Sequence, residues 1–467
     1  MSKKIFILLP DGIGLRNFAY SDFYQIGKQE GFEVTFWNNT PFDLSALGFD
    51  EIKIHGAKAH PLTEIFKNAR KQIELNLNIK KSGDAVYDTY RFPFSYKNLK
   101  TSIKNIATQV ITAVCNSEQG LRNVRKVIEK KERKTAFYRR SIETLKSKKP
   151  AMVFCTNQRP LLAIAPLLAA KDLGIPTATF IFSWDNLPKA TMVVETDYYF
   201  VWSEHMKREL LDYYPYILEK QIVVSGTPQF EAHFKKETLF SKEEFFEKYH
   251  LDVKTKYICY SGDDVTTSPD DPQYLADTAK AIRELNENGE RLGIIFRRCP
   301  VDFSGRFNEV IQQNSDVIVA IDPLWKKIGE GWNTILPTAE DVVLQQNIIQ
   351  HTEMVVNLGS SMVFDYVAHQ KPCAFINYDA AQQKLPGWSV KKIYNYIHFR
   401  SMPHCKAVVW LHSPEEIAEK IKNILQNSET TVKHAQNWFE VIAGPRPMTA
   451  SREIWNGIAM VIEQQQV

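Results

Sequence analysis

Short apolar runs alternate with segments of helical spacing along most of the chain. A run of four to eight apolar residues without polar alternation is typical of a strand buried on both faces of a parallel sheet. The runs of the first half are KKIFILLP, FEVTFWN, AMVFCTN, TATFIFS, DYYFVWS and QIVVSG. Those of the second half are KYICYSG, LGIIFRR, VIVAID, NTILPT, MVVNLG, PCAFINY and AVVWLHS. This alternation predicts an α/β protein with two Rossmann-like, doubly wound parallel-sheet domains.

The chain has 467 residues, which is too many for one ordinary hydrophobic core. Residues 41–150 have helical spacing without a clear strand, so we expect a helical insertion within a first domain of residues 1–226. A glycine-proline turn then leads into a second domain, expected over 227–440. After a proline break, a terminal helix within 441–467 is expected to cross back to the first domain.

The net charge is only +4, but its distribution is uneven. Residues 121–149 contain twelve Lys and Arg against three Glu, and their apolar positions recur at steps of three and four. This spacing predicts one basic helix with a packable face. The charges form either a solvated face or a patch that attracts anionic lipid headgroups or an anionic acceptor.

The six cysteines lie far apart without a C-x-x-C pair, which argues against a disulfide framework or a zinc site and favours a reducing cytoplasm. The N-terminal apolar run stops at Pro10 and Asp11, before it reaches signal-peptide length. The run LLAIAPLLAA is far shorter than the roughly 20 residues of a membrane span. We therefore expect a cytoplasmic protein that is at most peripheral to a membrane.

The turn after the run MVVNL lies at the kind of strand end where α/β proteins bind ligands. Gly359 permits close backbone approach, Ser360 and Ser361 offer hydroxyls, and the following helix would point its NH groups at an anion. A phosphate fits this turn. The alternative is that Ser361 only caps the helix.

Other strand ends of the second half supply further candidates for a donor site. Arg297 follows LGIIF, where its guanidinium could hold a diphosphate, and Asp263 follows KYICYSG, where it could bind hydroxyls. Asp365 lies one turn into the helix after the serines and could accept bonds from a ribose or face solvent. Asp341 is expected to favour the dipole at the start of its helix.

In the first half, the stretch SWDNLPKATM follows the strand TATFIF. Asp185 could take a proton from an acceptor hydroxyl, with Trp184 limiting water and Lys189 nearby. An Asx-type turn is an equal alternative for Asp185. The loop PDGIGLRN lacks the third glycine of a dinucleotide fingerprint, which argues against NAD, and leaves Asp11 and Arg16 as candidates for acceptor contact.

Three stretches resemble one enzyme family. NLGSSMVFDYVAHQKPCAFINYD is similar to the donor-site signature of the CDP-glycerol glycerophosphotransferases of teichoic acid synthesis, WDNLPK resembles their W-H-G-T-P-x-K loop, and RRCP their R-x-H-P. The resemblance covers residues 150–426 loosely. It implies a GT-B fold, in which two Rossmann-like domains face each other across a cleft. Asp185 and Cys299 stand where the family has a base histidine and a phosphate-contacting histidine.

These departures favour a nucleotide-linked sugar, with UDP among the candidate nucleotides, over glycerol phosphate as donor. The resemblance then implies a metal-independent, inverting glycosyltransferase that acts on a hydroxyl of a surface polysaccharide or lipid-linked acceptor. No metal, other cofactor or nucleic acid is expected. The alternatives are a glycerophosphotransferase-like polyol-phosphate transferase, a nucleotide-sugar epimerase and a catalytically silent GT-B scaffold.

Overall fold

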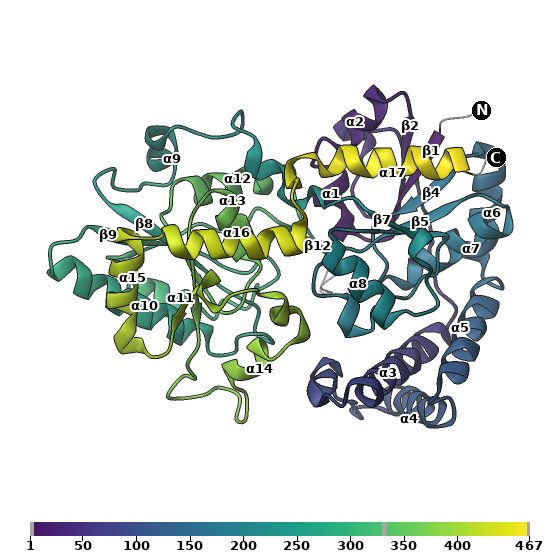
Figure 1. Ribbon diagram of the computed structural model, residues 1–467, viewed down its shortest axis with the longest axis horizontal. Coiled ribbons are helices and arrows are strands. Elements are labelled where there is room, and N and C mark those ends of the chain that lie inside the picture. Colours follow the sequence, from purple (N-terminus) through teal and green to yellow (C-terminus); the bar gives the residue numbers. More distant parts are fainter. Residues whose placement is uncertain (1–3, 329–333, 465–467) are drawn as a thin grey trace. The chain divides into compact units, whose positions relative to one another are not determined.

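The computed structural model describes residues 4–328 and 334–464 (Figure 1). The chain divides into two compact units. Unit 1 comprises Met1–Pro228 with Thr449–Val467, and unit 2 comprises Gln229–Met448. Each unit is built on one parallel sheet, as the sequence predicted.

Unit 1 contains a seven-stranded sheet in the order β3-β2-β1-β4-β5-β6-β7. Its strands are β1 Lys4–Leu9, β2 Glu33–Asn38, β3 Glu51–Lys53, β4 Met152–Cys155, β5 Thr177–Phe180, β6 Tyr198–Val201 and β7 Ile222–Val224. All but β3 coincide with predicted strands. The expectation of a strandless insertion is wrong at β3, a three-residue edge strand without a fully buried residue and hence without an apolar run.

The helices of unit 1 are α1 Leu15–Phe18, α2 Phe23–Gln29, α3 Thr63–Ser82, α4 Leu99–Val114, α5 Glu118–Glu132, α6 Ala136–Lys148, α7 Ile164–Asp172, α8 Glu204–Tyr213 and α17 Ala450–Gln464. The single basic helix predicted over 121–149 is in fact two, α5 and α6. The break occurs because Thr135 caps α6, its hydroxyl accepting a bond from the Tyr138 NH at 3.0 Å. Leu121, Val124 and Ile128 of α5 are buried.

Unit 2 contains a six-stranded sheet in the order β10-β9-β8-β13-β14-β15. Its strands are β8 Lys256–Ser261, β9 Leu292–Arg297, β10 Ile318–Ala320, β13 Val355–Asn357, β14 Cys373–Ile376 and β15 Val409–Leu411. The predicted strand NTILPT instead forms β12 Ile335–Leu336, which pairs with β11 Lys326–Lys327 outside this sheet, and its Asn333 lies outside the described residues.

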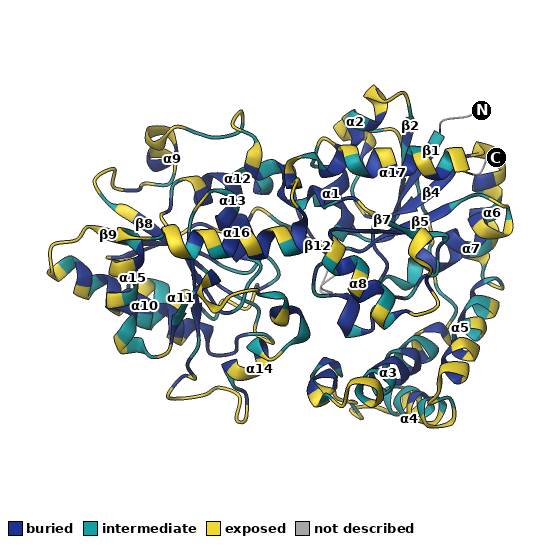
Figure 2. Cartoon of the chain, viewed as in Figure 1, coloured by how far each residue is buried: buried dark blue, intermediate teal, exposed yellow. Residues whose placement is uncertain are grey.

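The helices of unit 2 are α9 Lys242–Lys248, α10 Asp271–Glu287, α11 Asn308–Gln313, α12 Ala339–Gln350, α13 Met362–Ala368, α14 Val390–Tyr394, α15 Ile417–Gln426 and α16 Glu429–Ala443. Helices cover the strands of each sheet, which are largely buried (Figure 2). Across the described ranges, no helix combines the length and the apolar character that a membrane crossing requires.

The strand order of each sheet reverses direction once. In unit 1 the reversal lies between β1 and β4, and in unit 2 between β8 and β13. The loops that leave two such strands at their carboxyl ends diverge to opposite faces of the sheet, which opens a crevice where α/β proteins bind ligands. These two switch points therefore locate the regions in which to look for chemistry.

Helix α17 belongs to the core of unit 1 although it ends the chain. Trp455 stacks on Phe23 and Phe32 with ring centroids 4.8 and 4.9 Å away, and its indole NH donates to the Phe23 carbonyl at 2.7 Å. A Cβ added to Gly27 would lie 2.2 Å from the Trp455 ring. The tryptophan therefore fills a close-fitting site on α2.

We expect Trp455→Ala to lower the free energy of unfolding by about 3–5 kcal/mol, because it leaves a cavity and removes a buried hydrogen bond. Urea denaturation followed by circular dichroism measures the change. Met460→Ala, a truncation at a 41% exposed position of the same helix, is the matched control and should change stability by less than about 0.5 kcal/mol. Equal losses in the two variants would contradict this account of α17.

Candidate functional site

The turn from β13 to α13 lies at the switch point of unit 2. Gly359 has a φ of 65°, in the left-handed region that favours glycine. A Cβ there would lie 3.0 Å from Ile393 and 3.1 Å from Phe399, so the backbone passes close beneath these side chains. The Asn357 side-chain oxygen accepts a bond from the Ser360 NH at 2.9 Å. The turn is therefore held in one conformation.

The two serines of this turn have different surroundings. The Ser360 hydroxyl accepts a weak bond from the Met362 NH at 3.3 Å. Ser361 stands at the N-cap of α13 but makes no side-chain capping bond. The alternative that Ser361 only caps the helix is therefore wrong, and its half-buried hydroxyl is not used by the helix end.

Asp263 leaves β8 at the other side of the same switch point. Its backbone NH donates to Asp271 at 2.6 Å, and its carboxylate accepts from the Asp264 NH at 3.0 Å. Burial, together with the charges of Asp271 and Asp264, raises the pKa of Asp263 to about 8. The carboxyl group is then largely protonated at neutral pH and can donate a hydrogen bond, which makes it compatible with a phosphate or a sugar hydroxyl.

The Asp263 loop is anchored by Arg306, a residue that the sequence reasoning missed. Its guanidinium donates to the Asp263 carbonyl at 2.6 Å, to the Ser268 carbonyl at 2.6 Å and to the Asp302 carboxylate at 2.7 Å. The four-residue spacing of Asp302 and Arg306 was the only available signal.

Of the described residues, no group of three or more His, Cys, Asp or Glu is placed to hold a metal ion.

Arg297 is buried rather than presented at the sheet edge. Its Nη2 atom donates to both oxygens of Asp341 at 2.9 Å. Asp341 also accepts from the Leu324 NH and the Trp325 indole NH, each at 2.7 Å, so it does more than complement a helix dipole. The prediction that the Arg297 guanidinium holds a diphosphate needs correction, because this guanidinium already pairs with Asp341. Only its Nη1 atom, which is buried without a hydrogen-bond partner, is left for a ligand.

Asp365 does not face solvent, so that alternative is wrong, whereas its contact with a ribose stays a prediction. It is 2% exposed, and its Oδ1 atom lies 2.8 Å from Nε2 of His233. The other His233 nitrogen lies 3.1 Å from Nε2 of His369. Burial, then the neighbouring His233 and Lys371, lower the pKa of His369 to about 4. This internal chain of polar groups joins α13 to the start of unit 2.

The switch point of unit 1 brings Asp11 and Asn157 together. Asp11 caps a short 3-10 helix, Gly12–Gly14, by accepting from the Ile13 NH at 3.1 Å, and also accepts from the Asn157 amide at 3.2 Å. Burial raises the pKa of Asp11. Arg16 follows in α1 and is half-buried. The structure thus gives Asp11 a capping role and leaves its contact with an acceptor a prediction.

Asp185 lies in the loop that follows β5, and neighbouring residues of that loop bond to its carboxylate. Its carboxylate accepts from the Ser183 hydroxyl at 2.6 Å and the Asn186 amide at 2.7 Å, and forms an ion pair with Lys189. Trp184 beside it is buried. These are contacts between side chains, so the Asx-type turn stays a prediction. A base role remains a prediction, and it requires that a substrate displace one of these donors.

Cationic groups gather around this turn. Lys67 and Lys71 lie one turn apart on α3, and burial followed by the charges of Lys67, Arg159, Lys189 and Arg70 lowers the pKa of Lys71 to about 8. Burial and neighbouring cations also lower the pKa of Lys67. Cations that depress one another's pKa mark a region of excess positive potential. An anion bound there would relieve the repulsion.

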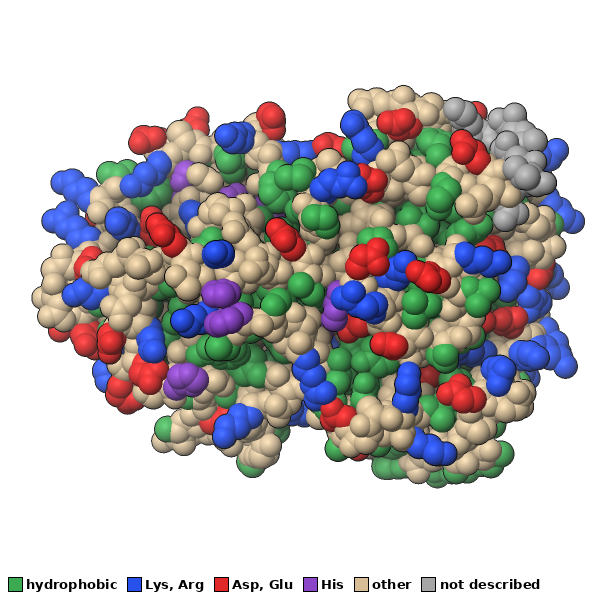
Figure 3. Space-filling view, in the orientation of Figure 1, with side chains coloured by type: hydrophobic (Ala, Val, Ile, Leu, Met, Phe, Trp, Pro, Cys, Tyr) green, Lys and Arg blue, Asp and Glu red, His purple; other side chains and the backbone are tan. Residues whose placement is uncertain are grey.

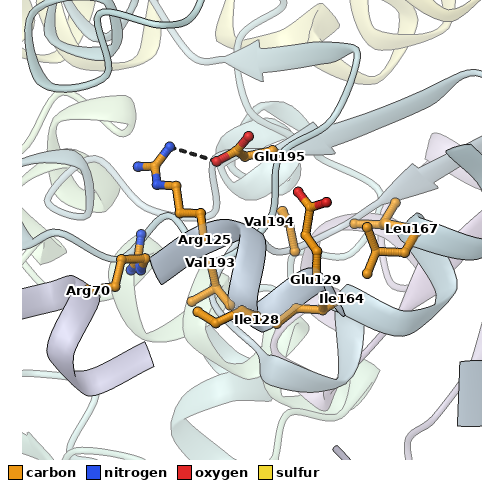
Figure 4. A pocket seen from close by; sticks show the side chains of 10 residues that line it. Arg70, Arg125, Ile128, Glu129, Ile164, Leu167, Val193, Val194 and Glu195 are labelled. Atoms are coloured by element: carbon orange, nitrogen blue, oxygen red, sulfur yellow. Dashed lines mark hydrogen bonds and ion pairs between the residues drawn. The ribbon is translucent and has the colours of Figure 1, made fainter. Parts of the chain in front are cut away.

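A buried ion network fixes α3 against the loop that contains Lys189. Arg70 donates to the Ala190 carbonyl and to Glu74, each at 3.0 Å. Arg125 of α5 bridges Glu74 at 2.7 Å and Glu195 at 2.8 Å. Figure 4 shows Arg125 directed at Glu195 above a small hollow with apolar lining from α5, α7 and the 193–195 segment. The two arginines of this network pair with its two glutamates, and we read the hollow as a packing feature.

We expect Asp263→Asn to reduce the loss of stability between pH 5 and pH 9. The folded-state pKa of about 8 lies above the ordinary value of 3.8, so the folded state holds the proton more tightly and stability falls as pH rises through this window. An asparagine stays neutral at both pH values. The free energy of unfolding of the variant, relative to that of the wild type, should therefore be about 1–3 kcal/mol higher at pH 9 than at pH 5. Urea denaturation at both pH values measures this difference, and a pH-independent difference would contradict it.

No protein-family model and no curated protein sequence matches the chain. Solved structures match its fold. The S. aureus MnaA–UDP complex is 14% identical with a TM-score of 0.54, over 99% of this chain and 97% of that one. The UDP-GlcNAc 2-epimerase from Methanocaldococcus jannaschii is 13% identical with a TM-score of 0.53, over 98% and 99%. The wall teichoic acid polymerase TagF, as a point variant, is 13% identical with a TM-score of 0.50, over 100% and 90%. These similarities, together with the two parallel sheets, show that the chain has the GT-B fold predicted from its sequence.

Proposed function

We propose that the protein is a glycosyltransferase that moves a sugar from a nucleoside-diphosphate donor to an acceptor hydroxyl. The observation that carries this proposal is the switch point of unit 2, where Asp263 and the Gly359–Ser361 turn follow the neighbouring strands β8 and β13. A structure of the same fold, S. aureus MnaA, contains UDP. UDP is therefore the first donor nucleotide to test.

The donor diphosphate would meet hydrogen-bond donors rather than a cluster of cations. The Ser361 hydroxyl is not used by the helix, Asp263 can donate its proton, and Nη1 of Arg297 has no partner. When the bond between the anomeric carbon and the diphosphate breaks, negative charge develops on the leaving oxygen. Donors that are already oriented stabilise this charge without reorganisation.

The acceptor would bind at the carboxyl ends of β4 and β5 in unit 1. Asp185 takes the proton as the acceptor oxygen forms its bond to the anomeric carbon and the nucleoside diphosphate leaves. The cations Lys67, Lys71, Arg159 and Lys189 favour an acceptor with a phosphate or carboxylate group, such as an anionic polysaccharide or a lipid-linked glycan. An anionic group that pairs with Lys189 would release one oxygen of Asp185.

The cationic region also distinguishes transfer from the alternatives. An epimerase acts on one nucleotide sugar and needs no second, anionic substrate, although the M. jannaschii structure shows that an epimerase can have this fold. Incubation of a UDP-sugar without acceptor tests this, because an altered sugar would identify an epimerase. Preference for CDP-glycerol would instead indicate polyol-phosphate transfer. Failure to bind any nucleotide would indicate a scaffold.

Calorimetric titration with UDP, CDP, GDP and CMP tests the donor site. We expect one diphosphate to bind, and Ser361→Ala to weaken it about three- to tenfold, since one hydrogen bond to an anion is lost. Ser428 is a matched control because it occupies the N-cap of α16, also without a side-chain capping bond. Ser428→Ala should leave the affinity unchanged. If both variants bind like the wild type, Ser361 does not contact the diphosphate.

Asp185→Asn tests the proposed base. The amide retains the size of the side chain but cannot accept the acceptor proton, so we expect kcat to fall about 100-fold or more while the donor Kd changes less than about twofold. Radiolabelled sugar transfer and calorimetry measure the two quantities. Ser183→Ala, which removes only a partner of Asp185, should cost far less than the asparagine. Full transfer by Asp185→Asn would exclude this residue as the base.

A further inference from the structure

Helix α4 turns its apolar side toward solvent. The apolar side chains recur at steps of four, three, four and four residues, so they lie along one face of the helix. We call them the α4 stripe, with exposed fractions of 76% for Leu99, 57% for Ile103, 54% for Ile106, 56% for Val110 and 81% for Val114. A surface helix ordinarily buries such a stripe against the core.

The opposite side of α4 is mostly polar and is the side that packs, with Ile111 as its apolar contact to the core. Thr108 is 1% exposed, and its hydroxyl donates to the Lys104 carbonyl at 2.9 Å. The Thr112 hydroxyl donates to the Thr108 carbonyl at 2.7 Å, and the Asn105 amide donates to the Ser95 carbonyl at 2.6 Å. Contacts with α3 hold the helix in this orientation. The amphipathic pattern is thus inverted, with satisfied polar groups inside and the stripe outside.

The segment before α4 adds aromatic side chains to the same surface. Phe92, Phe94 and Tyr96 are 81%, 37% and 54% exposed. Residues 92–114 hold eight of the 22 large hydrophobic side chains that are exposed in the described ranges, so the exposure is concentrated rather than scattered. In the space-filling view, hydrophobic side chains gather at the lower edge, where α4 lies in Figure 1 (Figure 3).

The charged residues of the segment that contains the stripe are all basic. Residues 89–117 contain Arg91, Lys97, Lys100 and Lys104 and no Asp or Glu. Arg91 and Lys104 pair with acids outside the range, whereas Lys97 and Lys100 are exposed beside the start of the stripe. A second copy of this chain would present the same stripe and no acid within residues 89–117 to pair with these lysines. A partner with an apolar interior and an anionic surface complements both features.

We propose that the α4 stripe docks on an anionic lipid bilayer. The stripe enters the boundary of the acyl chains, the aromatic side chains lie at the headgroup level, and Lys97 and Lys100 bind lipid phosphates. The proposal differs from the basic 121–149 patch considered from the sequence, because the apolar face of α5 is buried and cannot insert. It stands independently of the sugar-transfer reaction, since the test measures binding to lipid alone.

The test uses the full chain and sedimentation with vesicles of phosphatidylcholine, with and without phosphatidylglycerol. We expect binding only to the anionic vesicles, and a loss of at least about tenfold for Ile106→Glu with Val110→Glu. Both positions are exposed, so folding should be retained, as checked by circular dichroism and nucleotide titration. The matched control is Val253→Glu with Val265→Glu, at 54% and 53% exposed positions of unit 2, which should bind like the wild type.

The charge contribution has its own measurement. Lys97→Glu with Lys100→Glu should weaken binding, and added salt should weaken wild-type binding. Wild-type protein that does not sediment with anionic vesicles, or a stripe variant that binds equally, would overturn the proposal. Light scattering that shows a wild-type dimer and a monomeric stripe variant would also overturn it, in favour of a second copy as the occupant.

Discussion

Parallel strand pairing is the constraint on which the rest of this structure depends. Every strand of the two main sheets runs in the same direction as its neighbours, so each connection must return along a face of the sheet and every strand ends at the same edge. The chain proceeds from β1 and from β8 to one edge of its sheet and then returns to the other side of the same strand, which produces one switch point per sheet. Asp11 and Asn157, 146 residues apart in the chain, become hydrogen-bonded neighbours only because of this topology.

The same constraint explains how much of the fold can be predicted from the sequence. A central parallel strand is covered on both faces, so it is mostly apolar, and β4 and β14 were recognisable for this reason. Glu51–Lys53 lies at the sheet edge, where that requirement lapses, and its three residues contain no apolar run. The split of the basic segment depends on the Thr135 cap, a local bond that periodicity alone does not reveal.

The sequence predicted which candidate residues follow the strands, but not which side chains they pair with. Strand ends indicate which loops meet at the edge, and Asp263 with the Gly359–Ser361 turn follows from that reasoning. The buried pairs do not. Arg297 meets Asp341 from 44 residues away, and Asp365 meets His233 from 132 residues away. Burying a charge without a partner costs several kcal/mol, so these buried acids need partners. The partners are distant in the chain, and local sequence patterns do not predict them.

These internal pairs determine what charge a ligand meets at each sheet edge. In unit 2, Asp341 neutralises Arg297 and the carboxyl of Asp263 holds its proton, so the edge has little net charge and can recognise a ligand mainly through oriented hydrogen bonds. In unit 1, Glu74 is used within the Arg70 and Arg125 network, which leaves Lys67 and Lys71 to repel each other. Under the proposed function, the donor would therefore be recognised mainly by hydrogen bonding and the acceptor by its anionic group.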